Sequence, residues 1–269
     1  MPINYLALLT SPHRTNQSNL HLGVTLAFVA GALNAGGFLA IGQYTSHMSG
    51  IVSSASDNLV LGHIVLTLSA FLSLFAFVSG AATTSLLVNY AKRSSMTYIY
   101  TPSLILEAVL LLVFGLVGKK LQQHELVELS MTAVLLCYVM GLQNALITKI
   151  SHAEIRTTHV TGLVTDIGIE LGKLLYWNRT QTQHQHNPTL EPHNPHNPHN
   201  PQDPTSSDYT QQVVVNKTKL KVHCFLVLSF FSGGVIGAIG FSTIGFISTL
   251  PLAIALITLS VAPAFRQTK

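Results

Sequence analysis

The chain has 269 residues and a formal net charge of +4, and only 9% of its residues are charged while 48% are hydrophobic. Soluble domains carry roughly 25% charged residues, so this composition excludes an ordinary soluble fold. The sequence also lacks the segments of about ten residues with alternating polarity that a membrane β-barrel requires. We therefore predict an all-α membrane protein.

Six apolar blocks follow one another along the chain, and a helix needs about twenty such residues to cross a hydrocarbon core of roughly 30 Å. The blocks cover residues 22–44, 64–90, 101–118, 127–148, 221–246 and 249–265. With a cytoplasmic N-terminus, 12 of the 14 lysines and arginines lie on the cytoplasmic side, and only Lys119 and Lys120 lie outside. This distribution follows the positive-inside rule. We predict that both termini are cytoplasmic and that the basic residues orient the protein in the lipid bilayer, with no role in binding nucleic acid.

One sequence pattern occurs twice. The first copy consists of G-A-L-N-A, which begins at Gly31, and T-S-H-M-S-G, which ends at Gly50. The second consists of G-L-Q-N-A, which begins at Gly141, and T-T-H-V-T-G, which ends at Gly162. Self-similarity in a fixed order indicates a duplicated structural unit.

The duplication extends to the later blocks, because F-V-S-G-A at residues 77–81 matches F-F-S-G-G at residues 230–234. Each unit then has three spans, and an odd number of spans reverses the direction of the chain. We therefore predict about six transmembrane helices in two three-helix units that form an inverted repeat, as in many secondary transporters. The predicted boundaries are a cytoplasmic tail at 1–21, a first unit at 22–120 and a second unit at 127–265, interrupted by a disordered cytoplasmic loop rich in His, Asn and Pro at 177–219.

Small residues at regular spacing predict close contacts between membrane helices. The residues to which we assign this role are Gly31, Ala35, Gly80, Gly141, Ala145 and Gly233. Asn34 and Asn144 lie between the small residues of each copy, and an amide inside a span needs a partner. Each asparagine is either a clamp between helices or a ligand for a substrate, and the sequence leaves both open.

The hydroxyl residues around His47 and His159 suit helix N-caps, and Gly50 and Gly162 tolerate turns. A short re-entrant or interfacial helix is therefore predicted after each motif. Helix N-termini that point to the midplane favour an anionic or polar ligand, while the alternative is a capped helix at the membrane surface. The predicted substrate-binding set is Asn34, Ser46, His47, Ser49, Gln143, Asn144, Thr158, His159 and Thr161.

Ionisable residues are few, so each one within or beside a span is a functional candidate. Histidine is the side chain whose unperturbed pKa lies closest to neutrality, so His47 and His159 either relay protons or satisfy backbone carbonyls. Asp57 and Asp166 follow the two motifs, and Glu107 lies about six residues into the third block. We assign ion or proton coupling to Asp57, Glu107 and Asp166.

The sequence contains no recognisable nucleotide, dinucleotide, zinc-protease or nucleophile-elbow motif. Five histidines at 184, 186, 193, 196 and 199 lie in the proline-rich loop, where their spacing imposes no fixed metal geometry. We therefore predict no cofactor, no metal site and no catalytic residue. The sequence leaves the oligomeric state open, a homo-oligomer included.

The paired motifs resemble those of the YoaK-like family of bacterial integral membrane proteins, a family catalogued as a domain of unknown function. The residues that carry the resemblance are Gly31, Asn34–Ala35, Ser46–Gly50, Gly141, Gln143–Ala145 and Thr157–Gly162. The family typically has threonine where Ser49 stands. The resemblance implies a multi-pass protein of the bacterial inner membrane and brings no established substrate or reaction.

Three functional hypotheses remain. The first is a small secondary transporter or permease for a small polar or anionic solute, which would use the matched polar motifs as its solute site. The second is a non-transporting membrane scaffold or stress-related subunit, in which the motifs serve packing. The third is an intramembrane enzyme, which would need a nucleophile or metal triad that the sequence does not display.

Overall fold

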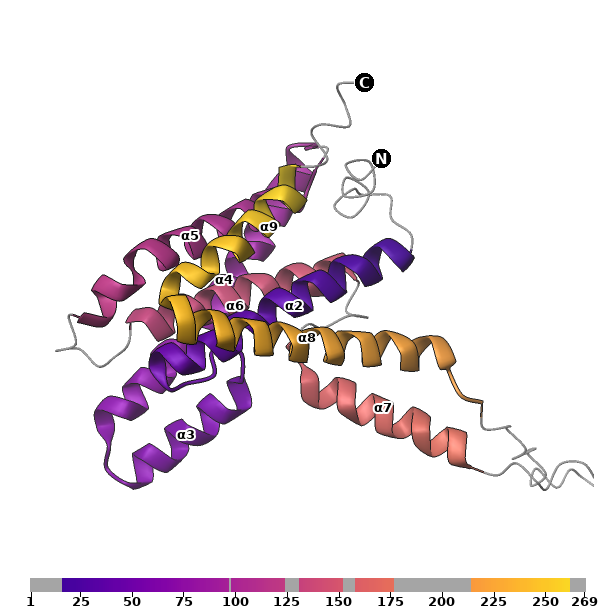
Figure 1. The fold of residues 1–269 in the computed structure, drawn as a ribbon, viewed down its shortest axis with the longest axis horizontal. Helices are drawn as coiled ribbons and strands as arrows, with labels where there is room; N and C mark the ends of the chain where they lie inside the picture. The colour runs from indigo at the N-terminus through magenta and orange to yellow at the C-terminus, as the bar shows by residue number, and fades with distance from the viewer. Residues whose placement is uncertain (1–15, 97, 124–130, 152–157, 177–213, 262–269) are drawn as a thin grey trace, which may run out of the picture.

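The computed structural model describes residues 16–96, 98–123, 131–151, 158–176 and 214–261. All regular secondary structure in these ranges is helical, which confirms the predicted all-α fold (Figure 1). The elements are α2 (Asn16–Ile41), α3 (Met48–Val60), α4 (Ile64–Arg93), α5 (Thr101–Gln123), α6 (Met131–Ile150), α7 (Val160–Leu175), α8 (Lys217–Ile244), the 3-10 helix η2 (Gly245–Ser248) and α9 (Thr249–Val261).

The six predicted apolar blocks correspond to α2, α4, α5, α6, α8 and α9. Five stretches of the described residues are long and apolar enough to cross a membrane, and the last of them, Lys217–Val261, includes both α8 and α9. Large apolar side chains cover the outside of the long helices, as Phe75 and Leu86 of α4 illustrate with exposed fractions of 69% and 70%. Such a surface is unsuited to water, so the chain is a multi-pass membrane protein.

Helix boundaries differ from the prediction by a few residues in most helices, and the starts of α2 and α8 are two clear examples. Helix α2 begins at Asn16, before the predicted start at 22, and α8 begins at Lys217, inside the segment predicted as a loop. The early start of α8 has a local cause, because the side-chain oxygen of Asn216 accepts a hydrogen bond from the Lys219 backbone N–H at 2.9 Å. Gly245, with φ of +66°, ends α8 and directs the chain into η2 and α9. The other residues of the predicted tail and loop, 1–15 and 177–213, lie outside the described residues.

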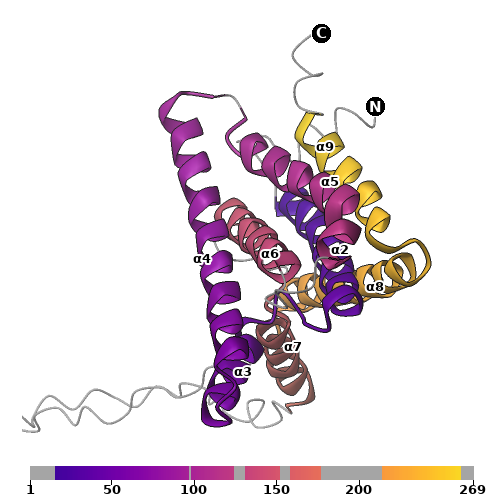
Figure 2. The ribbon, with the colours of Figure 1, turned by 90° about the vertical axis from the view of Figure 1, so that its left-hand side faces the viewer.

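The main helix pairs join the two halves of the chain. Helix α2 packs along α8, and α4 packs along α6 (Figures 1 and 2). Along the first pair, the Ser229 hydroxyl donates to the Val24 carbonyl at 2.7 Å, and Gly237 lies against Ala32 farther along both helices. The contacts thus advance together along α2 and α8, so these two helices run in the same direction. Helices α4 and α6 are likewise parallel, because Gly80 contacts Tyr138 and Thr84 donates to the Leu142 carbonyl at 2.9 Å.

Glycines at these two crossings allow the backbones to touch. A β-carbon added at Gly31 would collide with the Phe230 carbonyl, and one added at Gly141 would collide with the Phe77 carbonyl. On the partner helices, Gly80 lies in the same way against the Tyr138 carbonyl, and Gly233 lies against the Phe28 carbonyl. Both crossings therefore use the same arrangement of small residues, which is typical of helix contacts in membranes.

Helices α5 and α9 form a third pair, visible side by side in Figures 1 and 2. The Thr101 hydroxyl donates to the Ser260 carbonyl at 3.3 Å, and the Thr249 hydroxyl donates to the Leu111 carbonyl at 3.0 Å. The start of each helix thus contacts the far part of the other, so α5 and α9 are antiparallel. Both hydroxyls bond backbone carbonyls, which fixes the register of two apolar helices whose side chains offer few polar contacts.

Candidate functional site

The two short helices α3 and α7 follow the repeated motifs and begin close together. In Figure 1, α3 and α7 start near the middle of the molecule and diverge toward opposite sides. Their N-cap residues are His47 and His159, and neither N-cap side chain makes a capping hydrogen bond. The prediction of hydroxyl N-caps is therefore wrong, because a histidine occupies the N-cap position of each helix. One hydroxyl of each motif, that of Ser46 or Thr158, is instead bonded to the asparagine of the preceding span.

Asn34 and Asn144 connect each span to the loop that follows it. The side-chain oxygen of Asn34 accepts hydrogen bonds from the Ser46 backbone N–H at 3.1 Å and from the Ser46 hydroxyl at 2.9 Å. The side-chain oxygen of Asn144 accepts a hydrogen bond from the Thr158 hydroxyl at 2.6 Å. Ser46 and Thr158 both directly precede the motif histidine, so the same connection is made in both copies.

Each motif histidine folds back over the first turn of its own helix. A β-carbon at Gly50 would collide with the ring of His47, and one at Gly162 would collide with the ring of His159. Gly50 and Gly162 are thus needed for the space that the two imidazoles occupy. His47 and His159 are both exposed at the surface of the protein.

A pocket of about 320 Å³ lies where the two motif copies meet. Five predicted site residues line it, namely Asn34, Ser46, His47, Thr158 and Thr161. The lining also includes three residues that sequence reasoning missed, Tyr44, Val160 and Phe230. Tyr44 directly precedes the first motif and Val160 lies within the second, so their positions in the sequence were a usable signal. Phe230 comes from α8, and only the packing of α8 on α2 brings it there.

Four predicted site residues do not line this pocket. Ser49 and His159 are exposed, and Asn144 lies behind Thr158 through the hydrogen bond described above. Gln143 is fully buried, and its side-chain N–H donates to the Leu26 carbonyl of α2 at 3.0 Å. Gln143 therefore connects α6 to α2.

The acidic residues have three different environments. Asp57 is exposed on α3, and Glu107 is fully buried on α5. Asp166 is paired with α8, because one of its oxygens lies 3.2 Å from the Lys219 ammonium and the other lies 3.7 Å from the His223 ring nitrogen Nδ1. The structure thus separates the three candidates for ion or proton coupling.

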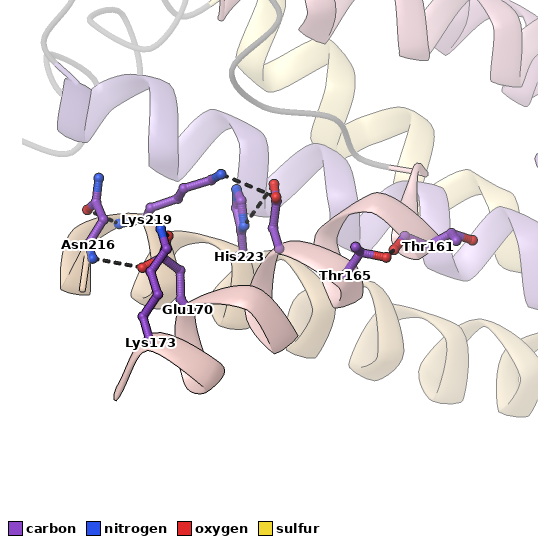
Figure 3. Close-up of polar contacts among 8 residues, drawn as sticks. Thr161, Thr165, Glu170, Lys173, Asn216, Lys219 and His223 are labelled. Atoms are coloured by element: carbon purple, nitrogen blue, oxygen red, sulfur yellow. Dashed lines mark hydrogen bonds and ion pairs between the residues drawn. The ribbon is translucent and has the colours of Figure 1, made fainter. Parts of the chain in front are cut away.

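A second acid of α7 was not among the predicted site residues. Glu170 accepts from the Lys173 ammonium at 2.9 Å and from the Asn216 backbone N–H at 2.8 Å (Figure 3). The hydrogen bond from Lys173, followed by that from Asn216, lowers the pKa of the Glu170 carboxyl. Figure 3 shows that these groups lie along the facing sides of α7 and α8, where the hydrogen bond between Glu170 and Asn216 and the ion pair between Asp166 and Lys219 connect the two helices.

The corresponding contact at the other motif copy involves no carboxylate. Asn58 of α3 faces His63, the N-cap residue of α4, with 3.3 Å between the Asn58 side-chain oxygen and the His63 ring nitrogen Nδ1. Glu170 of α7 contacts Asn216, the N-cap residue of α8. In both copies, a residue late in the short helix thus contacts the N-cap of the long helix that follows.

A family model described as a protein of unknown function (DUF1275) matches residues 22–262, so the chain belongs to this family. The match confirms the resemblance to the YoaK-like family that the paired motifs carry. Neither a curated protein nor a solved structure matches the chain significantly.

Proposed function

We propose that this member of the DUF1275 family is a small secondary transporter or permease whose solute site is the pocket between the two motif copies. The observation that carries the proposal is the composition of the pocket wall. Asn34, Ser46 and His47 come from the first motif, and Thr158 and Thr161 come from the second. Polar side chains that converge from two distant segments within an otherwise apolar bundle are typical of a binding site for a small solute.

The solute that we propose is small and polar or anionic. Helices α3 and α7 begin at the pocket, and their first backbone N–H groups have no side-chain cap from His47 or His159. Helix N-termini carry partial positive charge and donate hydrogen bonds. The pocket wall contains no carboxylate among its lining residues, so nothing in the wall repels an anion.

We further infer that the two halves form an inverted repeat. This inference is supported by contacts that recur at equivalent positions in the two halves. Gly31 and Gly141 each lie against the carbonyl of a phenylalanine, and that phenylalanine stands three residues before the glycine of the partner helix. The asparagine-to-hydroxyl bonds and the contacts of the short helices with the following N-caps recur in the same way.

An inverted repeat also supports a mechanism. If the units at 22–120 and 127–265 are related by an axis in the membrane plane, α3 opens toward one side of the bilayer and α7 toward the other. Rocking one unit against the other would then expose the central pocket to each side in turn. We place both termini in the cytoplasm and the protein in a bacterial inner membrane. The distribution of basic residues supports the orientation, and the family resemblance supports the location.

A scaffold role has one specific observation in its favour. Gln143 makes its contact between α6 and α2 without reaching the pocket, so part of the second motif serves packing. A scaffold would need no polar pocket between the two motif copies, however. The two functions differ in whether the pocket residues affect a solute or only the stability of the protein.

The test compares two pairs of residues at equivalent positions in the two motifs, His47 with His159 and Thr161 with Ser49. In each pair the first residue lines the pocket and the second does not. The full-length chain is purified and reconstituted in proteoliposomes, and uptake of chloride, formate, acetate, lactate, phosphate and sulfate is measured. We expect His47→Gln to reduce uptake of the transported anion about tenfold or more, while His159→Gln leaves it near wild type. Thr161→Ala is likewise expected to reduce uptake, while Ser49→Ala leaves uptake near wild type.

Two controls separate transport from packing. The Asn34→Leu/Asn144→Leu double variant is measured both for flux and for thermal unfolding in detergent. A loss of stability without any anion being transported by the wild-type protein would favour the scaffold. Equal uptake by the His47→Gln and His159→Gln variants would also contradict the proposed position of the solute site.

A further inference from the structure

Helix α5 carries a carboxylic acid in the interior of the bundle. Glu107 has no exposed surface, and both of its side-chain oxygens lack a hydrogen-bond partner among the described residues. An ionised carboxylate in an apolar environment without a partner is strongly disfavoured. Ionisable residues inside membrane spans are rare for this reason, and those that occur usually serve a function.

The surroundings of Glu107 contain another unpaired polar atom. Ser103, one helical turn earlier on the same face of α5, is buried and its hydroxyl oxygen also lacks a partner. The hydrogen bonds of Thr101 and Thr249 lie on either side of this segment. The antiparallel register that they define places Glu107 level with Ala253 of α9, whose small side chain is fully buried.

Among the residues that the structure describes, no opposite charge neutralises this carboxyl. The elements that pack against α5 are α9, η2, α6 and α4, and neither α9 nor η2 contains an ionisable residue. None of the ion pairs among the described residues involves Glu107. The ionisable side chains of α6 and α4 are Cys137, Tyr138, Lys149, Tyr90, Lys92 and Arg93, and α5 itself adds Lys119 and Lys120.

Apart from Lys119 and Lys120, the cationic groups among these are Lys149, Lys92 and Arg93, and all three lie in the last turns of α6 and α4. Lys119 and Lys120 lie near the opposite end of α5 from Glu107 and are exposed. The hydroxyl of Tyr138 is already bonded to Thr83 at 2.9 Å. Glu107 therefore has no cationic partner within the part of the chain that the structure describes.

We propose that Glu107 is a proton-binding site. In the conformation described here the side chain is a neutral carboxylic acid enclosed between α5 and its neighbours. When the contact between α5 and α9 loosens, water reaches the acid, the O–H bond breaks, and the proton passes to water while the carboxylate remains on Glu107. Return to the enclosed conformation requires the carboxylate to take up one proton again.

Only one of the two halves of the chain has a carboxylic acid at this position. Pro102 near the start of α5 corresponds to Pro251 near the start of α9, and the same offset pairs Glu107 with Leu256, which is apolar and fully buried. One chain therefore binds one proton at this site. That the proton drives solute movement rests on the proposed function, whereas the binding of the proton itself does not.

Infrared spectroscopy of the full-length protein in liposomes tests the proposal without any solute. At neutral pH, the wild-type protein is expected to show the C=O stretch of a protonated carboxylic acid. This band is expected to be lost in Glu107→Gln, shifted in Glu107→Asp and retained in Asp57→Asn, which removes an exposed carboxyl. Transfer into D₂O is expected to shift the wild-type band to lower frequency as the acid exchanges its proton.

Two results would overturn the proposal. One is a wild-type spectrum in which the Glu107 signal is that of a carboxylate at neutral pH. The other is a C=O band that never shifts in D₂O, which would make Glu107 a permanently sealed acid. Glu107→Gln has nearly the shape of the neutral acid, and the shifted band of Glu107→Asp provides the same assignment should the glutamine variant not fold. The pocket variant His47→Gln is expected to retain the band, so failure of the proposed solute site leaves this test unaffected.

Discussion

Gly31 of α2 lies so close to the backbone carbonyl of Phe230 on α8 that no β-carbon fits between them. The contact is between two backbones, and it is matched by Gly141 and Phe77 at the crossing of α6 and α4. Lipid chains are as apolar as the side chains of these helices, so the hydrophobic effect contributes little to their association. Close backbone packing is therefore a main source of their stability, and it can be tested at single positions.

Replacement of Gly31 by alanine is expected to destabilise the protein by about 1–3 kcal/mol, because the added methyl group meets a rigid carbonyl. Gly234 provides a matched control in the same helix pair. A β-carbon there would lie 3.7 Å from the Ala35 side chain, an ordinary contact, so Gly234→Ala should stay within about 0.5 kcal/mol of wild type. Thermal unfolding of both variants in the same detergent measures the difference. Equal unfolding temperatures would show that the crossing of α2 and α8 is looser than described.

The Gly50→Ala variant is expected to affect solute binding more than stability. Its methyl group would meet the His47 imidazole, which can rotate away at small cost because it is a flexible side chain. The displaced ring would then occupy part of the pocket that His47 lines. Anion uptake should fall several-fold while the unfolding temperature changes little. Gly162→Ala displaces His159, which does not line the pocket, and should leave uptake near wild type.

Gln143→Met is expected to be tolerated within about 1 kcal/mol. The substitution removes a hydrogen bond to the Leu26 carbonyl, which is in mid-helix and can retain its intrahelical bond. It also removes a buried side-chain oxygen that has no partner among the described residues, and the loss of an unpaired buried group offsets the lost bond. Gln143→Ala, which leaves a cavity, should cost clearly more. Unfolding in detergent compares them, and a severe loss in the methionine variant would indicate a further role for the amide.

Acid should weaken the contact between α7 and α8. Hydrogen bonds from Lys173 and Asn216 lower the pKa of Glu170 from its ordinary value of 4.5. A carboxyl whose pKa is lowered by folding stabilises the folded state fully when the pH is above its pKa in the unfolded chain. This contribution is lost as the pH falls through its pKa in the folded protein. Glu170→Gln should therefore unfold at a lower temperature than wild type at pH 7, and the difference should shrink below about pH 4. A difference independent of pH would show that the charge of Glu170 is not the cause.

The sequence predicted local features well and long-range ones poorly, for physical reasons. Asn34 and the motif around His47 could be recognised as polar groups at the end of an apolar block, and both line the pocket. The position of Phe230 depends on the contact of α8 with α2, which no local pattern encodes. Small residues around Gly31 predicted a close helix partner, but they do not identify that partner.

Helix ends and charged contacts also include features that the sequence did not predict. The cap of α8 by Asn216 is a single side-chain hydrogen bond that extends the helix into a segment whose composition predicts a loop. The gathering of charged residues on the facing sides of α7 and α8 was also not predicted from the sequence. Asp166 was recognised as an isolated acid, while its pairing with Lys219 depends on how α7 folds back onto α8.

The interlocking of the halves has a consequence for biosynthesis. The glycine face of α2 emerges from the ribosome early, but its partner α8 is made about 200 residues later. Until then α2 must wait in the bilayer with its packing surface open to lipid or to a helper protein. A ribosome stalled before residue 217 would leave a chain that has inserted but cannot assemble, and quality-control proteases would be expected to remove it.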